Sequence, residues 1–194
     1  YIYMNVGIIG RGGREHAICV SLKNSENTNN IYCFPGNAGT SLLAKNIETD
    51  LNNFEGLKKL IQKFDIDLVI IGPEKPLVDG LVDYLKKNRI KVFGPNKIAS
   101  QLEGSKIFTK KLCEKYDIPT ASFGVFDDIT KSLSYLEKCK FPIVVKADGL
   151  AAGKGVYICE TLEQSTRAVK EIFDGKFGKA KEILIEEFLE GEEM

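Results

Sequence analysis

Two lysines, Lys146 and Lys154, flank a turn that contains three glycines, Gly149, Gly153 and Gly155. Glycine permits positive φ and a close approach of the backbone to an anion, and the two lysines supply compensating positive charge. Lys146 follows three apolar residues, so its ammonium group requires an anionic partner. The pattern predicts a phosphate-binding loop between two strands, and a hairpin with exposed lysines is the alternative.

The spacing of these residues excludes one common phosphate-binding motif. The P-loop has four residues between its glycines and a Ser or Thr directly after its lysine. Here only three residues separate Gly149 from Gly153, and Gly155 follows Lys154. The predicted phosphate site therefore belongs to another class of nucleotide-binding protein.

A second candidate site lies near the N-terminus, where an apolar strand leads into a glycine turn and a helix. Gly12 and Gly13 precede Arg14, whose planar guanidinium suits bidentate phosphate binding at a helix N-terminus. A dinucleotide fingerprint would need a third glycine where Glu15 stands, which argues against NAD. His16 is the only histidine, and both a ligand contact and a structural role remain open for it.

Two more glycine-containing loops follow the next two predicted strands. The first contains Gly36 and Asn37, and the second contains Gly72, Pro73 and Glu74. Ligand loops in open α/β sheets lie at the carboxyl ends of the strands, so we expect all of these loops on one side of a sheet. The Glu74 carboxylate can accept two hydrogen bonds from a sugar diol. The alternative for the loop with Gly36 and Asn37 is a plain turn, and the alternative for Glu74 is a solvated acidic residue in a loop.

The composition excludes several classes of protein. The 194 residues are 43% hydrophobic and 28% charged, with 27 basic and 27 acidic side chains, so there is no basic surplus for nucleic acid or an anionic membrane. The apolar runs are too short to span a membrane, and the first residues lack the pattern of a signal peptide. Five scattered cysteines predict reduced thiols rather than disulfides or zinc sites. We therefore expect a cytoplasmic protein.

The order of the predicted elements indicates an α/β protein with two domains. Strands alternate with helices in the first half, which predicts a parallel sheet covered on both faces. Shorter strands and two helices follow after residue 120, so we place a boundary between Glu103 and Thr120. The predicted strands are 5–10, 31–34, 68–71, 91–93, 122–125, 143–146, 156–159 and 183–185. The predicted helices follow residue 13 and cover 54–64, 78–87, 129–138 and 162–172, with one more helix that carries Ile107, Phe108 and Leu112 and that Ser105 could cap.

The motifs together resemble a known family over essentially the whole chain. The chain is similar to the N-terminal part of the glycinamide ribonucleotide synthetases (phosphoribosylamine–glycine ligases), which belong to the ATP-grasp superfamily. Arg11 departs from the family pattern, in which an asparagine is common, and we expect little effect on the turn. The segments that carry the resemblance are 10–17, 35–40, 72–74, 102–106, 146–155 and 186–189.

The resemblance implies a fold and an activity. Residues 1–103 would form a Rossmann-like domain that binds phosphoribosylamine, and residues 104–194 the first, α+β part of an ATP-grasp domain, with a lid subdomain at about 121–190. The implied reaction joins glycine to 5-phosphoribosylamine through glycyl phosphate while ATP becomes ADP and phosphate. The implied partners are these small molecules, with ATP and Mg²⁺ or Mn²⁺ as cofactors.

The resemblance also assigns residues to the two ligands. Lys106 and Lys146 would contact the phosphates, the loop 149–155 would close over them, and Glu193 would bind the ribose hydroxyls. The full implied ATP-binding set is Lys106, Lys146, Gly149, Gly153, Lys154, Gly155, Glu187, Phe188, Leu189 and Glu193. The full implied substrate-binding set is Gly12, Gly13, Arg14, Glu15, His16, Gly36, Asn37, Gly72, Pro73 and Glu74.

The family's metal-binding carboxylates and asparagine would lie beyond Met194, so the resemblance implies no metal ligand within this chain. We accordingly expect the chain to be the N-terminal part of such a ligase and to be inactive by itself. The alternative is a non-catalytic module that binds nucleotide or serves regulation.

Overall fold

The computed structural model describes residues 3–150, 154–178 and 181–192. The chain divides into two compact units, residues 1–100 and residues 101–194, which are described one at a time. Within the described ranges, no helix combines the length and the apolar character that crossing a membrane requires.

The first unit is built on a five-stranded sheet in which every strand pair is parallel. The order is β3-β2-β1-β4-β5, so the first strand lies at the centre. The strands are β1 (Met4–Gly10), β2 (Thr28–Pro35), β3 (Lys45–Asn46), β4 (Leu68–Ile71) and β5 (Val92–Phe93). The helices are α1 (Gly13–Lys23), η1 (Thr40–Leu42), α2 (Phe54–Lys63), α3 (Glu74–Asp79) and α4 (Leu81–Lys87).

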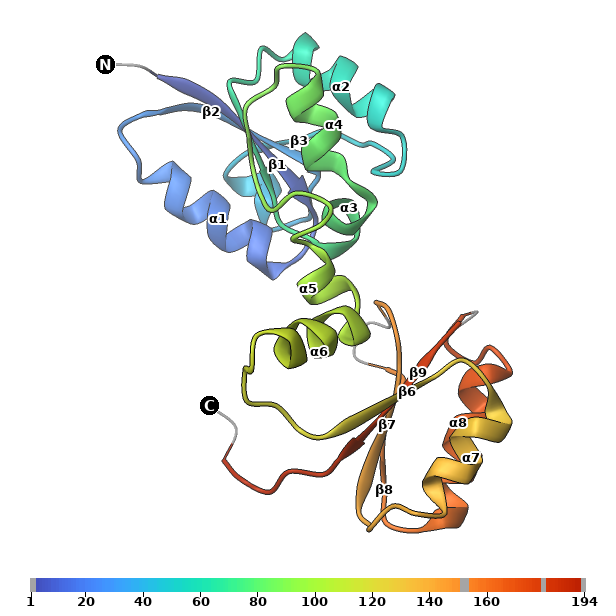
Figure 1. The fold of residues 1–194 in the computed structure, drawn as a ribbon. Coiled ribbons are helices and arrows are strands. Elements are labelled where there is room, and N and C mark those ends of the chain that lie inside the picture. The colour runs from blue at the N-terminus through green and yellow to red at the C-terminus, as the bar shows by residue number, and fades with distance from the viewer. Residues whose placement is uncertain (1–2, 151–153, 179–180, 193–194) are drawn as a thin grey trace. The chain divides into compact units, whose positions relative to one another are not determined.

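Helices cover both faces of this sheet (Figure 1). Successive residues of β1 point to opposite faces, as the period of a strand requires. Ile8 packs with Cys19 of α1, whereas Ile9 packs with Leu57 of α2 and Leu85 of α4. The alternating strands and helices of the sequence therefore give the predicted doubly covered parallel sheet.

The prediction of one helix over residues 78–87 is wrong in its details. Gly80 has a φ of 95° and ends α3, and α4 begins at the next residue. Glu74, which the sequence placed in a loop, is the first residue of α3 after the cap Pro73. Glycine in the left-handed region ends a helix without a side-chain clash, which explains the break.

The second unit contains a four-stranded antiparallel sheet in the order β6-β9-β7-β8. Its strands, and the helices predicted over 129–138 and 162–172, agree with the predicted segments to within a few residues. Ser105 caps α6 by accepting a hydrogen bond from the N–H of Phe108, as predicted. The elements are α5 (Gln101–Gly104), α6 (Lys106–Lys115), β6 (Phe123–Phe126), α7 (Ile129–Leu136), β7 (Ile143–Ala147), β8 (Val156–Cys159), α8 (Leu162–Phe173) and β9 (Ile183–Glu187).

The two faces of this second sheet differ in character. Val145 and Ile185 belong to the apolar core that includes residues of α7 and α8. Because side chains alternate along a strand, Lys146 and Glu186 lie on the opposite face, the side on which Figure 1 draws α6. The sheet thus has one apolar face and one face that carries charged groups.

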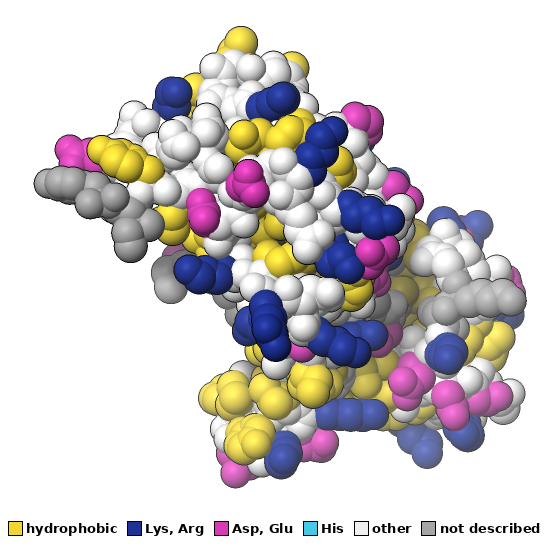
Figure 2. All heavy atoms as spheres, turned by 90° about the horizontal axis from the view of Figure 1, so that it is seen from above, with side chains coloured by type: hydrophobic (Ala, Val, Ile, Leu, Met, Phe, Trp, Pro, Cys, Tyr) yellow, Lys and Arg dark blue, Asp and Glu magenta, His cyan; other side chains and the backbone are white. Residues whose placement is uncertain are grey.

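The surface shows no single dominant charge on the side drawn in Figure 2, where Lys and Arg side chains lie among Asp and Glu side chains. This agrees with the formal net charge of zero. Any binding of a highly charged ligand must therefore come from a local arrangement of side chains.

Candidate functional site

Three loops meet at the carboxyl ends of β1, β2 and β4 in the first unit. The N–H of Gly36 donates to the carbonyl of Gly10 over 3.0 Å, and the N–H of Gly72 donates to the carbonyl of Ile9 over 3.1 Å. The structure therefore brings together the three glycine-containing loops that the sequence placed on one side of the sheet.

Asn37 fastens the loop after β2 to the loop after β1. Its Nδ2 donates to the carbonyls of Arg11 and Gly12 over 2.9 and 3.2 Å, and its Oδ1 accepts from the N–H of Thr40 over 2.9 Å. Gly36 beside it has a φ of 80°, and a Cβ at this position would collide with Thr40. The Asn37 Nδ2 thus joins the two loops and its Oδ1 braces the second loop, and both Nδ2 donors are already used.

Glu15 lies beneath the loops and is only 4% exposed. Its carboxylate accepts a hydrogen bond from the N–H of Gly12 at the start of α1. A Cβ at Gly10 or at Gly72 would collide with this carboxylate. Glu15 therefore caps the helix and fills the space under two glycines, a structural role that its place in the predicted ligand turn did not reveal.

Arg14 joins the loop after β1 to the loop after β4. Its guanidinium donates to the carbonyl of Gly72, and its Nη2 donates to Oε1 of Glu74 over 2.8 Å. The hydrogen bond from Arg14 lowers the pKa of the Glu74 carboxyl. The two residues to which the sequence gave separate ligand roles, Arg14 for a phosphate and Glu74 for sugar hydroxyls, are partners in this structure.

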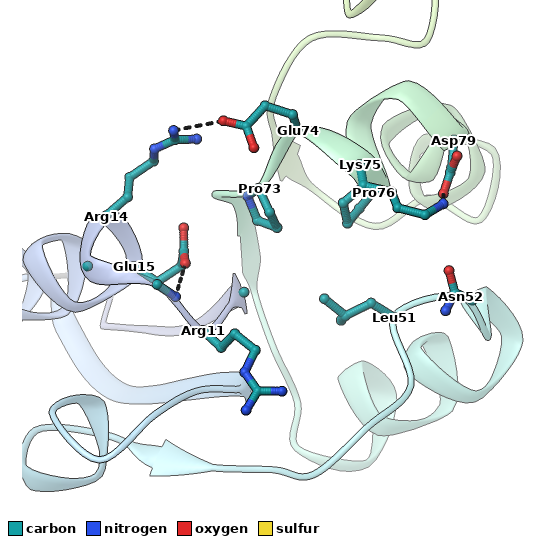
Figure 3. Close-up of a pocket in the computed structure, with 13 residues that line it drawn as sticks. Arg11, Arg14, Glu15, Leu51, Asn52, Pro73, Glu74, Lys75, Pro76 and Asp79 are labelled. Atoms are coloured by element: carbon teal, nitrogen blue, oxygen red, sulfur yellow. Dashed lines mark hydrogen bonds and ion pairs between the residues drawn. The ribbon is translucent and has the colours of Figure 1, made fainter. Parts of the chain in front are cut away.

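A cavity of about 550 Å³ opens where these loops and α3 meet. Figure 3 shows the Arg14–Glu74 pair at one side of it and Leu51 projecting into it from another side. Lys75 and Asp79 form an ion pair of 2.5 Å at its wall. The residues that line the cavity are Gly10, Arg11, Gly12, Gly13, Arg14, Glu15, Leu51, Asn52, Pro73, Glu74, Lys75, Pro76 and Asp79.

The cavity gathers part of the predicted substrate set and leaves part of it aside. Gly36, Asn37 and Gly72 shape the loops but do not line the cavity, and neither does His16. The His16 ring lies against Gly39, where an added Cβ would be 2.8 Å from the ring. Leu51 and Asn52 are lining residues that sequence reasoning missed, because neither belongs to a glycine motif and only the fold carries their loop to this place.

Lys146, which precedes the predicted phosphate loop, has an anionic partner within the chain. Its Nζ lies 2.7 Å from Oε2 of Glu186 on the neighbouring strand β9. The sequence argument that burial of Lys146 calls for an anion is thus satisfied by Glu186. Burial of this lysine is not, by itself, evidence for a bound phosphate.

Glu186 contacts a second lysine that sequence reasoning did not single out. Lys110 of α6 places its Nζ 3.3 Å from Oε1 of Glu186, and it donates to Thr120 Oγ1 over 2.6 Å and to the carbonyl of Ala121 over 3.1 Å. Lys110 lies three residues after the buried Ile107, a helical spacing that could have indicated its buried face.

The start of the glycine loop is attached to the N-terminus of α6. The Nζ of Lys106 donates to the carbonyl of Gly149 over 3.1 Å. Asp148 accepts from Ser105 Oγ over 2.9 Å and from the N–H of Ile107 over 3.2 Å. The contact between Lys106 and Gly149 brings together two members of the predicted ATP-binding set that lie 43 positions apart.

The remaining members of the predicted ATP-binding set are less closely grouped. Gly155, with a φ of 81°, packs against Phe177, and its carbonyl accepts a hydrogen bond of 2.8 Å from the N–H of Ala147. Lys154 is exposed. Gly153 and Glu193 lie outside the described residues.

The predicted adenine segment begins at the end of β9. Glu187 pairs with Ile143 in the sheet, whereas Lys146 pairs with Leu184. These two residue pairs are three positions apart along the strands, which corresponds to about 10 Å. The Ser122 N–H donates to the Glu187 carboxylate and lowers its pKa. Phe188 is half-buried and Leu189 is exposed.

Two family models match the chain in succession. Residues 4–103 match "Phosphoribosylglycinamide synthetase, N domain", and residues 104–194 match "Phosphoribosylglycinamide synthetase, ATP-grasp (A) domain". The chain belongs to the phosphoribosylglycinamide synthetase family. The predicted α/β fold, a parallel-sheet domain followed by the first part of an ATP-grasp domain, is thereby confirmed.

Two curated relatives are similar to this chain over nearly all of its length. The phosphoribosylamine–glycine ligase of Clostridium acetobutylicum is 47% identical over 98% of this chain and 46% of its own length. The ligase of Haemophilus influenzae is 46% identical over 98% of this chain and 45% of its own length. The chain therefore spans about half the length of the curated relatives it matches.

Solved structures agree with the assignment to this family. The phosphoribosylamine–glycine ligase of Thermotoga maritima has a TM-score of 0.78 and 32% identity, covering 97% of this chain and 44% of its own. The N5-carboxyaminoimidazole synthetase of Staphylococcus aureus, complexed with ADP, has a TM-score of 0.71 and 18% identity, covering 97% of this chain and 48% of its own. At 18% identity, the second likeness shows only that the two chains share a fold.

Proposed function

We propose that the protein to which this chain belongs joins glycine to 5-phosphoribosylamine and converts ATP to ADP and phosphate. In this proposal residues 1–103 bind phosphoribosylamine and residues 104–194 form the first part of the ATP-binding domain, with the lid subdomain at about 121–190. The family assignment, the names of the relatives and the arrangement of lysines in the second unit support the proposal.

The observation that carries the nucleotide part is the position of Lys106 and Lys146 beside the glycine loop. Lys106 donates to Gly149, and Lys146 is the fourth residue of β7, two positions before Asp148. An ammonium group carries three donors, so each lysine keeps donors for the oxygens of a polyphosphate. The Glu187 end of β9, about 10 Å further along the strands, would then receive the adenine.

The chemistry explains why such a site suits ligation. A carboxylate has no leaving group, and transfer of the γ-phosphoryl group of ATP to glycine would supply one as glycyl phosphate. The amine of phosphoribosylamine would then displace the phosphate. The tasks left for this chain are to position the two ligands and to balance phosphate charge.

Mg²⁺ or Mn²⁺ would accompany the nucleotide. Throughout residues 3–150, 154–178 and 181–192, no group of three or more His, Cys, Asp or Glu side chains could hold a metal ion. We therefore assign the metal ion to none of the described residues.

The cavity beside Arg14 is the proposed site for the phosphoribosyl group. It combines the N-terminal end of α1 with the guanidinium of Arg14, and Glu74, which lines the same cavity, would accept hydrogen bonds from ribose hydroxyls. The pairing of Arg14 with Glu74 means that a phosphate would compete with the carboxylate for the same guanidinium.

The five cysteines are free thiols, which fits the proposed cytoplasmic location.

The ligation is tested by ADP release that requires glycine and 5-phosphoribosylamine together. We expect such release from a chimera in which residues 1–194 are continued by the rest of the Clostridium acetobutylicum relative, and none from residues 1–194 alone. The relative itself is the positive control. A folded chimera that binds ATP but releases no ADP, beside an active relative, would contradict the ligase assignment and favour the non-catalytic module.

A further inference from the structure

Lys110 is a buried lysine that none of the predicted ligand contacts explains. Lys110 is 9% exposed, and its Nζ donates hydrogen bonds to Thr120 Oγ1 and to the carbonyl of Ala121. Burying a positive charge is unfavourable unless the charge is paired and hydrogen-bonded. The third neighbour, Glu186, supplies the opposite charge at 3.3 Å.

Glu186 lies between two ammonium groups that come from different elements. Its residue is 6% exposed, its Oε2 accepts a hydrogen bond of 2.7 Å from Lys146 of β7, and its Oε1 faces Lys110 of α6. The contact with Lys110 is an ion pair without hydrogen-bond geometry. One buried carboxylate therefore connects the helix to the strand that carries the predicted phosphate-binding lysine.

The sheet register alone does not fix this carboxylate. Lys146 is paired with Leu184 and Glu186 with Val144, so the lysine and the glutamate are diagonal neighbours on one face. Diagonal neighbours lie about 7–8 Å apart at the backbone, within reach of long side chains in several rotamers. Lys110 approaches Oε1 from α6, while Oε2 of the same carboxylate lies at Lys146.

The charges of Lys110, Glu186 and Lys146 also link Lys110 to the anion-binding capacity of Lys146. An isolated pair of Lys146 and Glu186 would be neutral and would attract a polyphosphate weakly. Lys110 adds a second positive charge next to the same carboxylate, so the three groups together carry one net positive charge, and the exposed Glu187 carboxylate near Lys110 accepts from the Ser122 N–H. Lys146, whose side chain is 26% exposed, can then offer its remaining donors to an anion.

We propose that Lys110 is a positioning residue of the nucleotide site: it balances and orients Glu186, and Glu186 holds Lys146 in place for a polyphosphate. The ligand in this statement rests on the proposed function. The arrangement of the three side chains does not rest on it, and the two parts can be tested separately.

The test uses the 194-residue chain with Lys110→Met, Lys110→Arg and the matched control Lys111→Met. Lys111 is the next residue of α6 and is exposed. The first measurement is the ¹⁵N NMR signal of the Lys146 ammonium, assigned by its loss in Lys146→Arg. The second is calorimetric titration with the non-hydrolysable ATP analogue AMP-PNP and Mg²⁺.

We expect Lys110→Met to shift the Lys146 signal and to weaken AMP-PNP binding by about tenfold, the range of one charge-assisted contact. Lys110→Arg, which keeps the charge, should retain most of the AMP-PNP affinity and leave the Lys146 signal near its position in the unsubstituted chain. Lys111→Met should change neither the affinity nor the signal. A folded Lys110→Met chain with an unshifted Lys146 signal would overturn the proposal. Equal losses in Lys110→Arg and Lys110→Met would also overturn it, because they would show that side-chain shape and not charge is needed.

A milder variant covers the case in which Lys110→Met does not fold. Thr120→Val keeps the lysine and removes only the hydroxyl oxygen 2.6 Å from its Nζ. The proposal expects a smaller Lys146 shift in the same direction, and no shift would contradict it. If the unsubstituted chain binds no AMP-PNP, the titration is made on the chimera with the Clostridium acetobutylicum relative; absence of binding there would contradict the nucleotide part of the proposed function, and the Lys146 signal still decides whether Lys110 is a positioning residue.

Discussion

Arg14 in the first turn of α1 donates a hydrogen bond of 2.8 Å to Glu74 at the start of α3, 60 positions further along the chain. The pair is exposed, so its contribution to stability is small. Both residues line the cavity, and in the proposed function a ligand phosphate would replace Glu74 at the guanidinium.

The first prediction concerns this exchange. Arg14→Ala should weaken binding of ribose 5-phosphate by roughly ten- to a hundredfold, since one charge-assisted contact is lost, and should leave the much weaker binding of ribose unchanged. Titration of both sugars into the 194-residue chain measures this. Arg167→Ala, which removes an exposed arginine of α8, is the control. Equal loss for both sugars would show that Arg14 does not contact the phosphate.

The second prediction concerns Lys146. Lys146→Met should weaken AMP-PNP binding by roughly ten- to a hundredfold through loss of a charge-assisted contact. It should also lower the free energy of unfolding by about 1–3 kcal/mol, because the buried Glu186 loses its 2.7 Å partner. Urea denaturation and calorimetry measure the two effects. Adding Glu186→Gln should recover part of the stability without recovering binding, and recovery of both would count against a phosphate contact by Lys146.

The third prediction compares two glycines of the cavity region. Gly72→Ala should destabilise the first unit by more than about 2 kcal/mol, because the new methyl group would collide with the buried Glu15 carboxylate. Gly13→Ala is the matched control, since a Cβ there meets nothing within 4 Å and the residue starts α1. Chemical denaturation of both variants is the measurement. Equal stability of the two would mean that Glu15 does not occupy the space beneath Gly72.

The fourth prediction follows from the buried thiols. Cys19 and Cys33 place their Sγ atoms 3.3 Å apart, and burial raises the pKa of Cys33 from 9.0 to about 12. The folded state thus keeps a proton that the unfolded chain releases above pH 9, so the free energy of unfolding should fall between pH 9 and 12.

Denaturation curves across that pH range test this effect, with Cys33→Ala as the reference for all other titrating groups. The slope should be shallower in Cys33→Ala, and identical slopes would contradict the raised pKa. Alkylation at neutral pH gives a second measurement, in which the half-buried Cys113 should react faster than Cys33.

The sequence by itself determined the order of the elements and the places of the loops. Alternating strands and helices indicate a covered parallel sheet, and the glycines at residues 10, 36 and 72 mark the strand ends, with positive φ at Gly10 and Gly36. Ser105 was recognised as a cap because capping depends on neighbours a few positions away. These are local properties, and local patterns in a sequence report them directly.

The tertiary structure decided which side chains meet. The pairing of Arg14 with Glu74, the contact of Lys106 with Gly149 and the place of Glu186 between two lysines join residues 40 or more positions apart. No local pattern marks such pairs, because the pairing of β1 with β4 in the first unit, and the pairing of β7 with β9 and the packing of α6 against β9 in the second, set the distances between them. Nothing in the sequence singled out Lys110, and only the fold surrounded it with oxygen atoms and a carboxylate, where a buried charge is stable.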